Sequence, residues 1–488
     1  MIVADLVADA LARAKARLLF TVMTHGPDGP AIEAAGRRGL RVVAAASGRA
    51  SCLMAAVLGS LLDAPGCTAL DDGEDAREAL GQAMRDRAPL VLVSSRPLAG
   101  DIRGIVKASV IVEAATAAHW SAHAAQLAMT DPRGPVQLVV SPGVATEPAI
   151  PVATSVRPAS SVVPTAAALD LAADILGGAV RPVLVVGLGC RSIEMATWIR
   201  ALAESLPAPV LVTRKGKGAV PDPHPLHLGL VERAAGRHPV LARADLVVMI
   251  GVDSIEVPTE AWPSPLAVLQ LASTPSTSPT GVEVVGDLSL AIAELAPRLR
   301  GRQRADWDVA EIDRLKRVTA VASSRVLGPH RLASHTVVGV VREATPPGTV
   351  AVVAADEDEL ALIAAWQTVA PGQLVVPTPP AVPGFAVAAA VAAGLAHPDA
   401  RTVCFASARE VLDGGPALAT AARLALPMLL LVIGRTGEVA SERAAVAREA
   451  VAAGWAATAV TDVNGLRRAI EGGLAARYPM LIDTRDAA

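Results

Sequence analysis

The sequence predicts an α/β protein built from three consecutive doubly wound parallel-sheet domains. At 488 residues the chain is too long for a single core and has room for about three domains of ~150 residues each. Short apolar runs alternate with amphipathic segments along its whole length, a pattern typical of strands covered by helices. A hydrophobic content of 52% and a mean hydropathy of +0.44 fit sheets that are buried on both faces.

The first predicted domain covers residues 1–150. It opens with an amphipathic helix and then alternates predicted strands with helices. The strands are expected at 18–23, 40–46, 90–94 and 136–140, and the helices at 31–38, 50–62 and 75–87. A stretch rich in Pro, Ser and Ala at 148–164 has no periodicity and is predicted to be a linker.

The second predicted domain covers residues 165–300 and the third covers 325–488. Between them, the charged segment 301–317 is expected to be a solvated helix and linker. Strands of the second domain are expected at 183–186, 210–212, 246–250, 267–271 and 282–285, with a helix at 193–205. Strands of the third are expected at 350–354, 374–377, 403–405, 428–433, 457–460 and 480–483.

Composition argues against several classes of partner. A net charge of −3 provides no basic stripe, and six Trp, three Phe and one Tyr leave few platforms for stacked bases, so nucleic acid is not an expected partner. The most apolar windows, such as 385–396, are too short to span a bilayer, and no export signal opens the chain. The four cysteines form no CxxC pair, which predicts buried free thiols and a cytoplasmic location.

Common catalytic motifs are missing from the sequence, which lacks a P-loop, HExxH and GxSxG. Gly187 and Gly189 follow a predicted strand where a dinucleotide turn would lie, but the third glycine is absent, so a tight turn without ligand is favoured. His224 and His227 are interpreted as loop-packing residues. The acidic run 356–359 fits either a cation site or a solvated helix start.

The segment 401–437 is predicted to form a strand, a turn, a helix and a second buried strand. Ligands of open parallel sheets bind at the carboxyl ends of strands, so the turns at Ser407 and Gly434 are where chemistry is expected. Neither position carries a metal-ligating carboxylate.

Long ordered stretches of the chain resemble the thiamine-diphosphate enzymes of the acetolactate synthase and benzoylformate decarboxylase type. The middle third does so through RPVLVVGLG, APVLVTRKGKGAVPDPHPLHLGL and ARADLVVMIGVD. The first third does so through MRDRAPLVLVSSRP and RGPVQLVVSPGV, and the last through VPGFAVAAAVAAGLAHPDARTVCF and RYPMLIDTR. The resemblance implies a pyrimidine-binding-like domain, a central domain and a diphosphate-binding-like domain.

The resemblance also implies where a cofactor would bind, and the family's ligands are missing there. The family's glutamate, which contacts the pyrimidine ring, falls at Gly48. The Asp of its Gly-Asp-Gly turn, a magnesium ligand, becomes Ser407, and its Asn pair becomes Gly434 and Arg435. Gly384 matches a glycine that the family precedes with a bulky apolar residue, here replaced by Pro383. We therefore expect no metal and no thiamine diphosphate.

Two functional hypotheses follow from the resemblance. In the first, the chain is a derived member that either reuses its interdomain cleft for a small anionic substrate or serves as a non-catalytic partner of an intact homologous subunit. In the second, it remains a thiamine-diphosphate-dependent 2-oxo acid decarboxylase or carboligase, with Mg²⁺ ligands from positions such as Asp413 or Glu410.

If the chain is catalytic, His25 and Arg435 are the candidate catalytic residues. His25 has a side chain suited to proton transfer near neutral pH, and Arg435 could hold an anion in place of Mg²⁺. The alternatives are a structural histidine in a Gly/Pro turn and a surface arginine. The resemblance also implies a homodimer or homotetramer.

Overall fold

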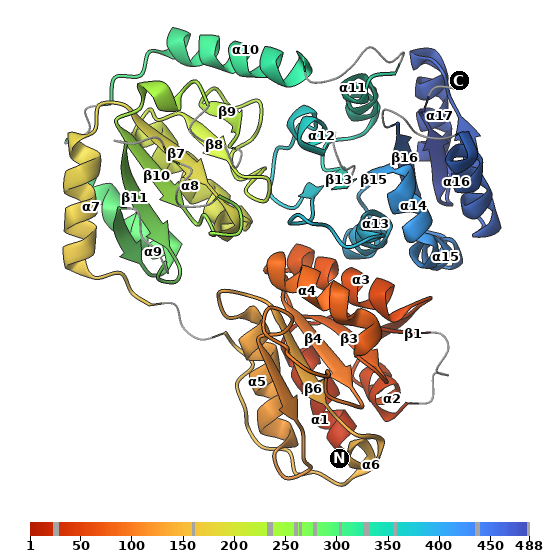
Figure 1. Ribbon diagram of the computed structural model, residues 1–488. Coiled ribbons are helices and arrows are strands. Elements are labelled where there is room, and N and C mark those ends of the chain that lie inside the picture. Colours follow the sequence, from red (N-terminus) through yellow and green to blue (C-terminus); the bar gives the residue numbers. More distant parts are fainter. Residues whose placement is uncertain are drawn as a thin grey trace. The chain divides into compact units, whose positions relative to one another are not determined.

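The computed structural model describes residues 1–22, 29–158, 162–231, 238–257, 262, 266–276, 281–301, 305–325, 332–354, 359–434 and 440–485. Three six-stranded sheets follow one another along the chain (Figure 1). All the strand pairs whose register is given are parallel, apart from an isolated bridge between Ile2 and Pro148. The predicted fold class is therefore confirmed.

The first sheet has the strand order β2-β1-β3-β4-β6-β5. Helices α1 and α5 pack on one of its faces, where their apolar side chains join those of the strands in one core. The strands are β1 (Leu18–Val22), β2 (Arg41–Ala45), β3 (Gly66–Leu70), β4 (Leu90–Ser94), β5 (Ala108–Ile111) and β6 (Pro135–Val139). The helices are α1 (Val3–Arg13), α2 (Pro30–Arg37), α3 (Gly48–Leu62), α4 (Arg77–Arg85), α5 (Ala117–Met129) and α6 (Pro142–Thr146).

The second sheet has the order β12-β11-β10-β7-β8-β9 and two hydrophobic cores, one on each face. Its strands are β7 (Pro182–Val186), β8 (Val210–Val212), β9 (His227–Leu230), β10 (Leu246–Ile250), β11 (Ala267–Ala272) and β12 (Val282–Val285). Its helices are α7 (Ala166–Gly178), α8 (Ile193–Ser205), α9 (Leu288–Leu299) and α10 (Val309–Arg325).

The third sheet has the order β14-β13-β15-β16-β18-β17. Its strands are β13 (Val350–Ala354), β14 (Leu374–Val375), β15 (Thr402–Ser407), β16 (Met428–Ile433), β17 (Ala456–Ala459) and β18 (Met480–Asp483). The helices of this part are α11 (Ser334–Ala344), α12 (Glu359–Ala365), α13 (Phe385–Ala396), α14 (Ala408–Asp413), α15 (Gly415–Arg423), α16 (Ala440–Ala452) and α17 (Val463–Ala475).

Contacts divide the chain into two compact units. One comprises Met1–Ala159, Ala351–Asp356 and Pro377–Ala488, and the other comprises Ser160–Val350 and Glu357–Val376. The domain limits 1–150, 165–300 and 325–488 remain predictions. Among the described residues, no helix combines the length and apolar character needed to cross a membrane.

Helices α3 and α13 pack against each other inside the first unit. The side chains of both are buried almost all round, as expected of helices that are apolar on every face. The apolar window 385–396 is therefore a core helix. The loop before α13 is held by α4, where Gln82 donates to the Thr378 carbonyl at 3.1 Å and Asp86 accepts from the Thr378 amide at 2.7 Å.

Segment 301–317 was predicted to be a solvated helix and linker; the helix is present as the start of α10, but the prediction that the segment is solvated was wrong for Trp307, Ile312 and Leu315. Trp307 is buried and its Nε1 donates to the Pro182 carbonyl at 2.9 Å. Ile312 and Leu315, one turn apart on α10, join the same core of the second sheet. High charge on one face of this helix concealed an apolar face that packs on the sheet.

Candidate functional site

A cavity of about 410 Å³ brings two of the predicted cofactor positions together. Gly48 at the start of α3 and Gly384 at the start of α13 both line it. The remaining walls come from the end of β1, from Asp75, and from the junction between α14 and α15, residues 413–417. All of these residues belong to the first compact unit.

Gly48 occupies a position where a larger side chain has little room. A Cβ added there would lie 3.0 Å from the Asp75 Cβ and 3.5 Å from the Leu70 Cδ1. The helix is capped just before it by Ser47, whose hydroxyl accepts from the Ala50 amide at 3.2 Å. Asp75 therefore packs against the position that a side chain at residue 48 would enter.

Ser407 ends β15 and is almost completely buried. Its hydroxyl accepts a hydrogen bond from the Glu410 amide at 3.4 Å, so it serves as the N-cap of α14. A neutral hydroxyl in this role offers a weaker ligand to Mg²⁺ than a carboxylate would.

Glu410 is the residue whose role the sequence did not reveal. Its side chain is buried and reaches the start of α13. One carboxylate oxygen accepts a hydrogen bond from the Gly384 amide at 3.3 Å, and the other accepts one from the Ala386 amide at 3.0 Å. Amides at a helix start form a natural anion site. In this chain the anion is a side chain of the protein.

Gly384 itself is required by the backbone. It has φ +80°, and a Cβ added there would lie 2.7 Å from the Asp413 carbonyl oxygen. The glycine thus allows α13 to begin directly beside the end of α14.

Gly434 follows β16 and is packed against a buried ion pair. A Cβ on Gly434 would lie 3.2 Å from the Arg485 Cγ. Arg485 donates to both carboxylate oxygens of Asp483, at 2.8 and 2.6 Å, and both residues are buried. The sequence analysis missed this pair. The sequence does contain a signal for it. Asp483 and Arg485 lie two positions apart at the end of β18, and this spacing places their side chains on the same face of the strand.

His25 and Arg435 lie outside the described residues, as do residues 356–358 of the acidic run. Glu359, the last residue of that run, starts α12 and accepts from Arg214 at 2.9 Å. Asp413, an alternative metal ligand, lies 3.5 Å from the Arg409 guanidinium. The described part of the chain contains no cluster of three His, Cys, Asp or Glu side chains that could hold a metal ion.

The glycine turn after β7 also holds a carboxylate of the protein. Glu256 accepts from the Leu188 amide at 2.9 Å and from the Thr213 hydroxyl at 2.5 Å. Burial raises the pKa of Glu256, although these hydrogen bonds act in the opposite direction. Gly187 is needed here because an added Cβ would lie 2.5 Å from the Val252 Cα. This arrangement favours the tight turn over a nucleotide site.

The two histidines of the Pro-rich loop have structural surroundings. His224 Nε2 lies 3.2 Å from a Glu204 carboxylate oxygen near the surface. His227 is buried, and burial lowers its pKa to about 4 despite the nearby Asp222 carboxylate. The four cysteines are free and buried, as predicted, and burial raises the pKa of each thiol.

Residues 169–295 match the family described as thiamine pyrophosphate enzyme, central domain. Over 271 residues the chain is 24% identical to the acetolactate synthase isozyme 1 large subunit of Escherichia coli strain K12, covering 54% of this chain and 47% of that protein. Over 200 residues it is 30% identical to the sulfoacetaldehyde acetyltransferase of Rhodobacter capsulatus, covering 38% and 32%. The chain thus matches about half of the first relative's length and about a third of the second's.

Solved structures resemble the chain over nearly its whole length. The thiamine diphosphate-dependent 4-hydroxybenzoylformate decarboxylase of Rhodococcus jostii has a TM-score of 0.81 at 19% identity, covering 99% of both chains. The benzoylformate decarboxylase of Polynucleobacter necessarius has a TM-score of 0.81 at 17% identity, covering 100% of this chain and 99% of the other. At these identities the likeness establishes a shared fold.

Proposed function

We propose that the chain, whose residues 169–295 match the central domain of thiamine pyrophosphate enzymes, is a derived member of that family that no longer binds Mg²⁺–thiamine diphosphate. The observation that carries this proposal is the Glu410 carboxylate on the Gly384 and Ala386 amides. A diphosphate at this helix start would have to displace a buried carboxylate or lie beside it, with strong repulsion between like charges.

The two neighbouring positions support the same proposal. Ser407 uses its hydroxyl as a helix cap, and Gly434 has no side chain and is backed by Arg485. Mg²⁺ bound to a diphosphate usually takes one or two carboxylates from the protein. The described residues at the positions matching the family's ligands supply none, so we derive no reaction step through the cofactor.

We further propose that the 410 Å³ cavity binds a small anionic ligand. Its volume lies within the range of small-molecule sites. Arg49 in the first turn of α3 lines it, and a helix start together with a guanidinium favours an anion. Asp75 and Asp413 line the same cavity, so the ligand must be small and weakly charged. The cytoplasmic location and the homodimeric or homotetrameric state remain part of this proposal.

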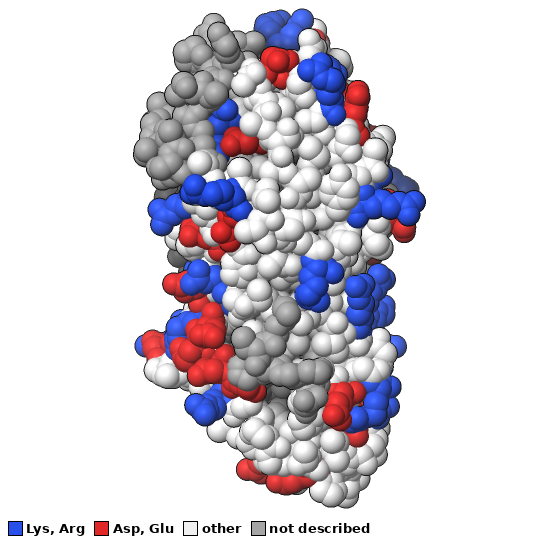
Figure 2. All heavy atoms as spheres, turned by 90° about the vertical axis from the view of Figure 1, so that its right-hand side faces the viewer, with Lys and Arg blue, Asp and Glu red and all other residues white. Residues whose placement is uncertain are grey.

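The face drawn in Figure 2 agrees with a small-molecule function. Lys and Arg are interspersed with Asp and Glu there, and the coloured residues form no continuous basic stripe. A non-catalytic role beside an intact homologous subunit is the second form of the proposal. Co-purification of this chain with such a homologue, in a fixed ratio, would favour that form.

Calorimetric titration of the full chain with thiamine diphosphate and Mg²⁺ tests the main proposal. We expect no saturable binding for the wild type. Binding with a micromolar dissociation constant that depends on Mg²⁺ would instead support an active 2-oxo acid decarboxylase or carboligase with unusual ligands.

Titration with inorganic diphosphate tests the role of Glu410 directly. Glu410→Ala vacates the two amides, so we expect its affinity for diphosphate to rise by roughly tenfold or more, since hydrogen bonds to a charged group are worth about 1.5–3 kcal/mol. Glu471→Ala, which removes an exposed carboxylate of α17 that does not line the cavity, is the matched control. Equal affinities for the two variants would contradict the proposal.

A further inference from the structure

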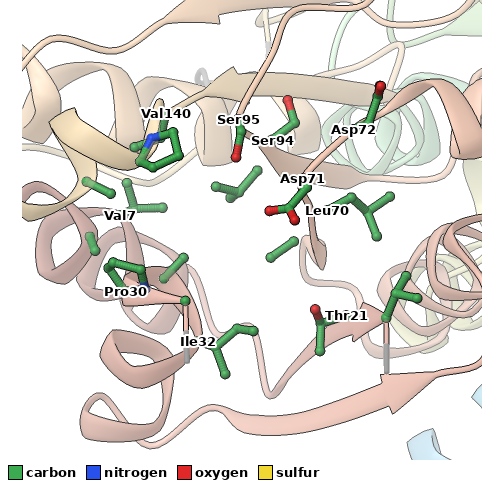
Figure 3. Close-up of a pocket in the computed structure, with 18 of the residues that line it drawn as sticks. Val7, Thr21, Pro30, Ile32, Leu70, Asp71, Asp72, Ser94, Ser95 and Val140 are labelled. Carbon is green, nitrogen blue, oxygen red and sulfur yellow. The ribbon is translucent and has the colours of Figure 1, made fainter. Parts of the chain in front are cut away.

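A second cavity, of about 380 Å³, is formed by the first domain alone (Figure 3). It lies at the carboxyl ends of β1, β3 and β4, the edge at which open parallel sheets bind ligands. Most of its lining is apolar. The apolar wall includes Val7 from α1, Pro30 and Ile32 from α2, and Leu70 at the end of β3.

Thr21, near the end of β1, is one of three hydroxyl-bearing residues in the lining, with Ser94 and Ser95. It is 8% exposed, and within the described part of the chain its hydroxyl has no hydrogen-bond partner. Figure 3 shows the Thr21 hydroxyl and the Asp71 carboxylate turned into the cavity. The Thr21 hydroxyl is therefore open to a hydrogen bond from a ligand in the cavity.

The charged residues of the lining are all acidic. Asp71, Asp72 and Asp75 line the cavity, and no Lys, Arg or His is among the described residues that do so. The Asp72 carboxylate already accepts from the Glu74 amide at 2.9 Å. A concave site lined by one sign of charge and apolar walls concentrates ligands of the opposite sign.

We propose that this cavity binds a small organic amine. Its apolar body packs against Val7, Ile32 and Leu70, and its ammonium group donates to the Asp71 carboxylate and the Thr21 hydroxyl. The proposal goes beyond the function proposed above, because it uses neither the α13 helix start nor Arg49 and applies whether or not the chain binds thiamine diphosphate.

Calorimetric titration of the full chain near neutral pH with three probes of matched size tests the chemistry of the site. The probes are benzylammonium, benzyl alcohol and benzoate. We expect benzylammonium to bind most tightly and benzoate least, because only the first carries a positive charge opposite the acidic lining together with several N–H donors. Absence of saturable benzylammonium binding, or benzoate binding of equal strength, would overturn the proposal.

Three variants locate the site. We expect Asp71→Asn to weaken benzylammonium binding by roughly tenfold or more, since it removes a charge-assisted hydrogen bond. Thr21→Val, nearly the same size, should weaken both benzylammonium and benzyl alcohol by several-fold. Asp399→Asn removes an exposed carboxylate of the third domain and should change neither.

Thermal unfolding of each variant checks that its fold is retained. If Asp71→Asn does not fold, Thr21→Val and the order of the three probes still decide the proposal. Unchanged benzylammonium affinity in folded Asp71→Asn and Thr21→Val would place the binding elsewhere and exclude this cavity as the amine site.

Discussion

Two carboxylates of this chain accept hydrogen bonds from backbone amides at a helix start and at a glycine turn. Glu410 bonds to the amides at the start of α13, and Glu256 bonds to the Leu188 amide in the glycine turn after β7. Each carboxylate satisfies backbone donors that would otherwise be buried without a partner. In both places a side chain of the protein supplies the acceptor for backbone donors at a helix start or turn.

The sequence reveals part of this arrangement. Ser407 followed three residues later by Glu410 has the spacing of a capping box, so the cap of α14 was predictable. The capping box would return the glutamate to its own helix start, whereas Glu410 reaches α13 instead. That contact joins residues 24 positions apart, which local spacing does not specify. The sequence shows glycine at positions 48 and 434, but it does not reveal that Asp75 and Arg485 lie next to them.

At the residue scale, His227 makes the stability of the second unit depend on pH. Burial lowers its pKa to about 4, whereas an unfolded histidine titrates near 6.5. As pH falls through this interval, the unfolded chain takes up a proton that the folded chain does not, so the free energy of unfolding decreases. The loss attributable to His227 is roughly 3 kcal/mol by pH 4.

Denaturant titrations between neutral pH and pH 4 measure this effect. His227→Asn removes the titrating group, so the variant should lose less stability than the wild type over the same interval. A variant whose unfolding free energy falls as steeply as that of the wild type would show that His227 is not the group responsible.

At the scale of elements, strand prediction succeeded where apolar runs were continuous. Strands β4, β8, β10, β12, β13, β16 and β18 have the predicted limits, and the other predicted strands differ by one or two residues at one or both ends. Three strands were missed, namely β3 (GCTAL), β5 (ASVI) and β9 (HLGL). They are short and contain Gly, Ser or His, and their pairing partners stabilise them more than their own residues do.

One of these missed strands packs extremely close to α3. Gly66 begins β3, and a Cβ there would lie 1.8 Å from the Ala55 carbonyl oxygen on α3. We expect Gly66→Ala to lower the free energy of unfolding by about 3 kcal/mol or more, because backbone atoms cannot move aside as a flexible side chain does. Equilibrium unfolding measures the change.

Gly36 on α2 provides the matched control for this substitution. It is exposed, and a Cβ there meets nothing within 4 Å. Gly36→Ala should therefore stabilise the chain by about 0.5–1 kcal/mol through its higher helix propensity. If the two substitutions changed stability equally, the close packing of α3 on β3 would not be the cause.

At the scale of the whole molecule, alternation of strands and helices was enough to predict three parallel sheets. It was not enough to predict which segments form compact units. Residues 357–376 follow β13 in the chain, yet they cluster with the second unit. The reason is a set of buried polar contacts between residues far apart in sequence, and hydrophobic periodicity carries no information about them.

Asp222 forms the centre of these contacts. Its carboxylate pairs with Lys217 Nζ at 2.8 and 2.9 Å and accepts from both the amide and the hydroxyl of Thr368, 146 positions away. The Lys217 side chain is almost completely buried, and the Asp222 side chain is 11% exposed. Burial lowers the pKa of Lys217, and the Asp222 carboxylate opposes this change.

Removal of this carboxylate should destabilise the second unit selectively. Asp222→Asn leaves the Lys217 ammonium buried without its counter-ion, which costs about 3–5 kcal/mol. Adding Lys217→Met removes the unpaired charge, so the double variant should recover much of that loss. Differential scanning calorimetry should show a lowered transition for this unit while that of the first unit stays in place. Failure of Lys217→Met to restore stability would mean that the Thr368 contacts, rather than the ion pair, hold residues 357–376 to this unit.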